Sequence, residues 1–151
     1  MAASSHLGGL IPTVLMLTLG AGIAQAHIGV SPTQSKLGEK ETYTLIVPTE
    51  GKSATTAVEL DVPSGVAILS VTAPAAEYSV VKSGERITRI TWQVNIPPGT
   101  RKELVFVAQN PASAVRGVRW NVHQVFADGS RADWIDPPPA RPAPSTRFVA
   151  N

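Results

Sequence analysis

The chain has 151 residues, a formal net charge of +2 and no cysteine. Without cysteine it forms no disulfide and binds no metal through thiolate. The lysines and arginines are scattered and do not form a stripe with aromatic residues, which argues against nucleic-acid binding.

The first 26 residues have the pattern of a secretory signal peptide. An apolar stretch at 7–24 leads into the small-x-small triplet Ala24-Gln25-Ala26, a typical signal-peptidase site. No Lys or Arg precedes this stretch, so an uncleaved membrane anchor is the alternative, although Pro12 interrupts the apolar run. We expect cleavage after Ala26, which places a soluble mature protein in the periplasm or outside the cell with His27 as its first residue. No later segment approaches the roughly 20 apolar residues of a membrane span.

The potential metal ligands of the mature chain are few. Met1 and Met16 both lie in the signal segment, so no sulfur ligand remains after cleavage, and the remaining histidines are His27 and His123. A free α-amine and the imidazole of His27 can close on one metal ion as a chelate. Nitrogen and oxygen ligands suit Cu(II), whereas Cu(I) favours sulfur.

The region after the signal is predicted to be all-β. Apolar and polar residues alternate with period two, and the alternating runs are separated by proline, glycine and Asp-Gly turn signals. We expect strands at 42–47, 56–62, 66–71, 78–82, 87–94, 103–109, 118–126 and 131–134, and no helix. Short strands at this spacing predict an antiparallel β-sandwich of the immunoglobulin or fibronectin type. This gives a signal peptide at 1–26, a sandwich at 27–136 and a Pro/Ala-rich, poorly ordered tail at 137–151.

Four stretches in order along the chain resemble the YcnI-like domain family, long known as a domain of unknown function. They are His-x-x-Val-x-Pro at 27–32, TTAVELDVPSGV from Thr55, RITRITWQVNIPPG from Arg86 and QVFADGSRADWIDPPP from Gln124. The resemblance implies an exported β-sandwich that binds Cu(II) through a histidine brace containing a single histidine.

The resemblance also implies which residues form the site. The metal ligands would be the amine and imidazole of His27 and the carboxylate of Glu59, and Trp134 would lie beside the copper. Asp133 and Asp136 flank this tryptophan where the family usually has Arg and Gly. We therefore expect additional negative charge near the metal.

Each of these residues also has a plain structural interpretation. Glu59 alternates with apolar neighbours, so the pattern alone indicates a solvated strand face, which Asp61 shares. Trp134 follows a turn, and core packing is its alternative role. His123 lies within a strand, where a structural role is expected; as a ligand it would complete a two-histidine brace.

Mid-strand positions place Trp92 and Trp120 in the core.

The leading functional hypothesis is an extracytoplasmic Cu(II)-binding accessory protein that carries, buffers or delivers copper and is not an enzyme. The family context implies a periplasmic copper carrier or a membrane copper transporter as the partner. A histidine-brace copper oxidase is one alternative, and a metal-free secreted interaction module is the other.

Overall fold

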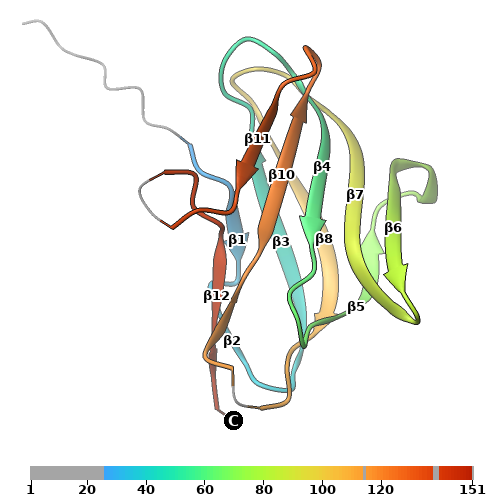
Figure 1. The fold of residues 1–151 in the computed structure, drawn as a ribbon, viewed down its shortest axis with the longest axis vertical. Helices are drawn as coiled ribbons and strands as arrows, with labels where there is room; N and C mark the ends of the chain where they lie inside the picture. The colour runs from blue at the N-terminus through green and yellow to red at the C-terminus, as the bar shows by residue number, and fades with distance from the viewer. Residues whose placement is uncertain (1–25, 114, 138–139, 151) are drawn as a thin grey trace, which may run out of the picture.

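The computed structural model describes residues 26–113, 115–137 and 140–150, and in this part of the chain it is a β-sandwich (Figure 1). The predicted signal peptide falls almost wholly outside the described residues. No helix in the described residues is long and apolar enough to cross a membrane. The strands and one short 3-10 helix are β1 (Gly29–Ser31), β2 (Gln34–Lys36), β3 (Lys40–Pro48), β4 (Thr55–Asp61), β5 (Ala67–Thr72), η1 (Ala75–Glu77), β6 (Tyr78–Ser83), β7 (Arg86–Ile96), β8 (Arg101–Gln109), β9 (Gly117–Arg119), β10 (Asn121–Phe126), β11 (Arg131–Trp134) and β12 (Ser145–Val149).

Two antiparallel sheets form the sandwich. One has the order β1-β3-β8-β5, and the other has the order β11-β10-β4-β7-β6. A third sheet, β2-β12-β9, lies at the end where the chain terminates (Figure 1). The fold class predicted from the sequence is therefore confirmed.

The core lies between the two main sheets and is dominated by aromatic side chains. Tyr43, Phe106 and Trp120 are fully buried. The ring centroid of Trp120 lies 4.9 Å from that of Tyr43 and 5.4 Å from that of Phe106. Trp92 is 2% exposed and packs on Phe106. The predicted core positions of Trp92 and Trp120 are confirmed.

The tight turn between β10 and β11 follows from its sequence. Gly129 has a φ of +83°, a left-handed conformation that costs glycine little. Asp128 accepts hydrogen bonds from the backbone N–H and the hydroxyl of Ser130, at 2.9 and 2.6 Å. These bonds hold the pKa of Asp128 below its ordinary value.

The structure corrects the sequence analysis at three places. The predicted strand 118–126 is divided at Trp120 into β9 and β10. The short strands β1 and β2 were not predicted. The prediction of a disordered tail is wrong for Ser145–Val149, which form β12 between β2 and β9 and bury Phe148.

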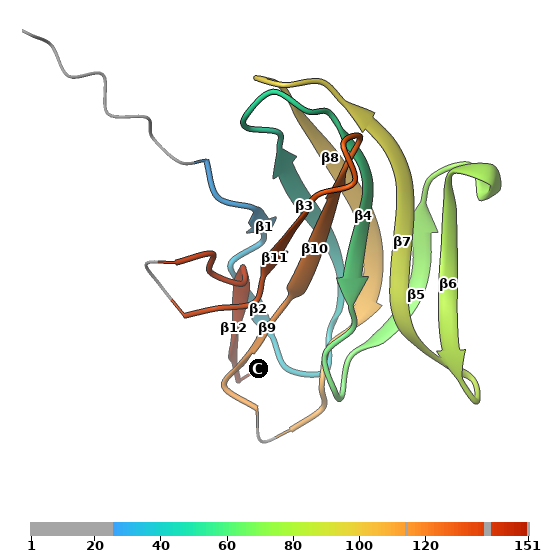
Figure 2. The ribbon, with the colours of Figure 1, turned by 45° about the horizontal axis from the view of Figure 1, so that its top comes forward.

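The edge strands of the two main sheets determine where the described residues before β1 lie. β1 is the edge strand of one main sheet, and β11 is the edge strand of the other. Figures 1 and 2 show both on the same side of the molecule, opposite β5 and β6. Residues 26–28, just before β1, therefore lie near β11, at the open edge between the two sheets.

Candidate functional site

His27 lies two residues before the start of β1 and is exposed to solvent. Its ring contacts the indole of Trp134, the last residue of β11, with ring centroids 5.9 Å apart and planes tilted by 60°. Trp134 itself is 7% exposed and belongs to the core cluster. The structure thus brings these two predicted site residues together, and Trp134 is at once a core residue and a neighbour of His27.

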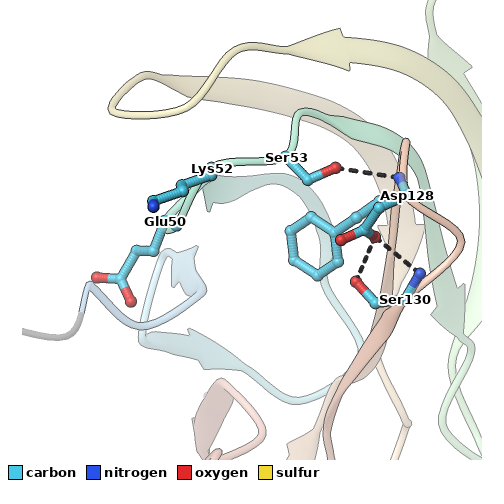
Figure 3. A pocket seen from close by; sticks show the side chains of 7 residues that line it. Glu50, Lys52, Ser53, Asp128 and Ser130 are labelled. Carbon is cyan, nitrogen blue, oxygen red and sulfur yellow. Dashed lines mark hydrogen bonds between the residues drawn. The ribbon is translucent and has the colours of Figure 1, made fainter.

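The carboxylate beside this N-terminal segment belongs to Glu50. The backbone N–H of Ala26 donates a hydrogen bond to its Oε1, and Figure 3 shows the side chain directed toward the start of the described chain. The pairing of β1 with β3 explains this position. Gly29 pairs with Ile46 in an antiparallel register, so residues 26–28 run alongside the residues that follow β3.

A hollow of about 330 Å³ adjoins the same place. Its lining includes Ala26, Glu50, Trp134 and the side of the β10–β11 hairpin. A neighbouring, more open hollow of about 470 Å³ lies between Glu50 and the Asp128 turn (Figure 3). His27 and Glu50 therefore lie at a surface that an ion can reach from solvent.

Glu59 lies on the other face of its sheet. Residues paired across neighbouring strands point to the same side, and Glu59 pairs with His123, which pairs with Asp133. Trp134, next to Asp133 in the strand, points to the opposite side. It pairs with Val122, and both are buried between the sheets. The structure therefore brings His27 and Trp134 together but does not bring Glu59 to them.

The Glu59 carboxylate is held by two arginines. Its Oε2 lies 2.7 Å from a guanidinium nitrogen of Arg131 and 3.5 Å from one of Arg89. Hydrogen bonds to Glu59 and Asp133 raise the pKa of Arg131. In this structure Glu59 serves to neutralise charge on the outer face of the sheet.

His123 lies on this outer face between two carboxylates. Its Nδ1 is 2.6 Å from Asp133, and its Nε2 is 2.9 Å from Asp61. Hydrogen bonds from His123 and Arg131 hold the pKa of Asp133 below its usual value. Partial burial opposes ionisation of Asp61, but hydrogen bonds from His123 and Arg89 outweigh it and lower its pKa. Both ring nitrogens of His123 are therefore already engaged.

The two aspartates that flank Trp134 occupy different surroundings. On the face opposite to the indole, the carboxylate of Asp133 lies 2.6 Å from Nδ1 of His123 and 3.0 Å from Nε of Arg131. Asp136 is exposed, and its backbone bonds to Arg141 and Ala143. The charge of Asp133 is therefore balanced by its own neighbours.

Side chains alone do not make a metal centre in the described residues. No group of three or more His, Cys, Asp or Glu side chains among them is arranged to hold a metal ion. A metal site at His27 would gain from a donor that is not a side chain. The α-amine that cleavage would create is such a donor.

Comparison with known proteins identifies the family. The model of the family described as "Domain of unknown function (DUF1775)" matches residues 70–148. The chain belongs to the DUF1775 family.

One sequence match and one solved structure extend the comparison of this DUF1775 chain. It is 34% identical over 115 residues to the "Copper-binding protein CutI" of Bacillus subtilis (strain 168), which covers 74% of this chain and 56% of the relative. The match thus spans little more than half the length of that relative. The fold is similar to that of an uncharacterized protein from Nocardia farcinica described as having an immunoglobulin-like fold, with a TM-score of 0.67 and 22% identity over 82% of this chain and 98% of that one.

Proposed function

We propose that the chain is an extracytoplasmic copper-binding protein that holds Cu(II) through the α-amine and imidazole of His27. Family membership and 34% identity to a protein named for copper binding support a copper-related role. The observation that carries the proposal is the position of His27, exposed at the sheet edge beside Trp134 and next to a carboxylate.

The donor set fits Cu(II). An amine, an imidazole and a carboxylate supply two nitrogens and one oxygen, which suit the tetragonal geometry that Cu(II) prefers. A chelate from one residue also loses less entropy on binding than two separate side chains would. These donors supply no sulfur, so the chemistry favours Cu(II) over Cu(I).

The carboxylate that we favour is that of Glu50. Cleavage after Ala26 replaces a peptide N–H with an amine one residue further on, a step of about 3.8 Å along the chain. Glu50 accepts a hydrogen bond from Ala26, the residue directly before His27, and cleavage would remove this donor and leave the carboxylate near the new amine. Glu59 remains a prediction from the family resemblance, and a role for it requires the N-terminus to reach past β11 and β10, a span of about 10 Å at the usual strand spacing.

Trp134 would restrict how the His27 imidazole is oriented and how far it is exposed to water. Its indole lies next to the His27 ring and is itself held in the core. It therefore limits the orientations of the imidazole and excludes water from that side. This favours capture and release of the ion over an open site for oxygen and a second substrate.

The role that follows is that of a carrier or buffer. An oxidase built on a two-histidine brace would need His123, whose two nitrogens bind Asp61 and Asp133 on the opposite face of the sheet. Delivery to a periplasmic copper carrier or a membrane copper transporter completes the proposal. Export through the predicted signal at 1–26 is part of it.

The test uses two forms of the protein. One begins at His27, and the other carries one additional alanine before it, which converts the amine to an amide. Competition with a chelator of known affinity should give one Cu(II) site in the first form and much weaker binding in the second. Equal affinities would overturn the chelate.

A second comparison identifies the carboxylate. Glu50→Gln should weaken Cu(II) binding and shift its electron paramagnetic resonance parameters, whereas Glu59→Gln should leave both nearly unchanged. Asp61→Asn is the matched control on the outer face of the sheet. The opposite order of effects would assign the ligand to Glu59.

A further inference from the structure

The buried amide of Gln124 lies between Trp134, which contacts His27, and the end of β3, which leads to Glu50. Gln124 is on β10, faces the interior opposite Val58 and Ala132, and is 2% exposed. An apolar side chain is the usual occupant of such a position. Burying an amide costs free energy unless its polar atoms are hydrogen-bonded.

Gln124 makes three hydrogen bonds there. Its Oε1 accepts from the indole N–H of Trp134 at 3.2 Å. Its Nε2 donates to the backbone carbonyl of Pro48 at 2.8 Å and to the hydroxyl of Thr55 at 2.6 Å. The orientation of the amide is set by chemistry, because an indole N–H only donates and a carbonyl only accepts.

These partners belong to both sheets. Trp134 ends β11 in one sheet, and Pro48 ends β3 in the other. The hydroxyl of Thr55 also shares a hydrogen bond of 2.6 Å with that of Thr49, the residue between Pro48 and Glu50. One side chain therefore ties the indole beside His27 to the segment that carries Glu50.

We infer that Gln124 is a positioning residue of the copper site. It holds the Trp134 indole of one sheet against the His27 ring and fixes the end of β3 in the other sheet, so that the imidazole and the Glu50 carboxylate, which flank β1 and β3, approach one ion. This role rests on the proposed function and adds a residue that does not itself touch the metal. Groups that orient metal ligands commonly change metal affinity by 10- to 100-fold when they are replaced.

The test replaces Gln124 with methionine, which keeps the length of the side chain and removes its polar atoms. The matched control is Thr146→Val in the third sheet, which removes the hydroxyl that accepts the buried indole N–H of Trp120 at 3.1 Å and donates to the backbone carbonyl of Pro32 at 3.0 Å. Both variants lose a buried indole hydrogen bond, and both are made in the protein that begins at His27.

Three measurements distinguish positioning from stability. In metal-free protein, nuclear Overhauser effects between the His27 ring and the Trp134 indole should weaken in Gln124→Met and persist in Thr146→Val. With Cu(II), Gln124→Met should bind about tenfold more weakly and show altered copper hyperfine coupling. Thermal unfolding should show a loss of stability in both variants.

The outcomes separate the two proposals. If wild-type protein binds Cu(II) through His27 but Gln124→Met keeps the ring contact, affinity and spectrum, the positioning role is wrong and the proposed function stands. If wild-type protein shows no His27-dependent site, both fail. Should Gln124→Met not fold, Gln124→Glu retains an oxygen for Trp134 and loses the amide donors. It should keep the ring contact yet bind copper more weakly, and unchanged affinity would overturn the inference.

Discussion

Replacing His123 with alanine tests whether the outer face of the five-stranded sheet is structural. The substitution removes the hydrogen bonds to Asp61 and Asp133, at 2.9 and 2.6 Å. Charge-assisted bonds contribute about 1.5–3 kcal/mol each when buried, and exposed pairs contribute under about 1 kcal/mol. His123 is only 13% exposed, but its partners are 35% and 46% exposed. We therefore expect a loss of about 1–2 kcal/mol in the free energy of unfolding.

The same variant should bind Cu(II) like the wild type. His123 lies on the face of the sheet opposite to Trp134, and its ring nitrogens point to carboxylates. Urea unfolding measures the stability change, and chelator competition measures the copper affinity. A large loss of copper affinity with little change in stability would refute this reasoning and favour a two-histidine brace.

Three further predictions concern the fold. Burial raises the pKa of Tyr43 to about 12 from 10.0, so its phenol stabilises the fold fully below pH 10. This contribution, at most about 2.7 kcal/mol, is lost as the pH rises to 12, and Tyr43→Phe should flatten the fall in unfolding free energy over that range. Phe148→Ala should destabilise by about 3 kcal/mol in denaturant titration, and no change would contradict the packing of β12. Gly129→Val should lower the melting temperature because of its positive φ, whereas an unchanged value would argue against the turn.

The strands with a clear alternating pattern were predictable from the sequence. β3, β4, β7 and β8 each place every second residue in the core, and their bounds differ from the predicted ones by at most two residues. β1, β2 and β12 were not predictable in the same way. They have only three to five residues, too few to show a clear alternating pattern.

The candidate site was predictable in part. His27 and Trp134 were identified from the cleavage pattern and the family resemblance, and the structure places them in contact. Glu50 and Gln124 were missed because neither has a local signal. Glu50 lies in a loop, and its position depends on the pairing of β1 with β3. Gln124 lies in an otherwise ordinary strand pattern, and only its three buried hydrogen bonds reveal a role.

The most direct test of the central claim is to count the nitrogens bound to copper. The protein beginning at His27 is prepared with ¹⁵N only in histidine, loaded with one equivalent of Cu(II), and measured by electron-nuclear double resonance. Our account predicts strong coupling to two ¹⁵N nuclei, the amine and one ring nitrogen of the same residue, unchanged in His123→Ala and lost in His27→Ala. Coupling to two imidazoles, or a signal that survives His27→Ala, would contradict it.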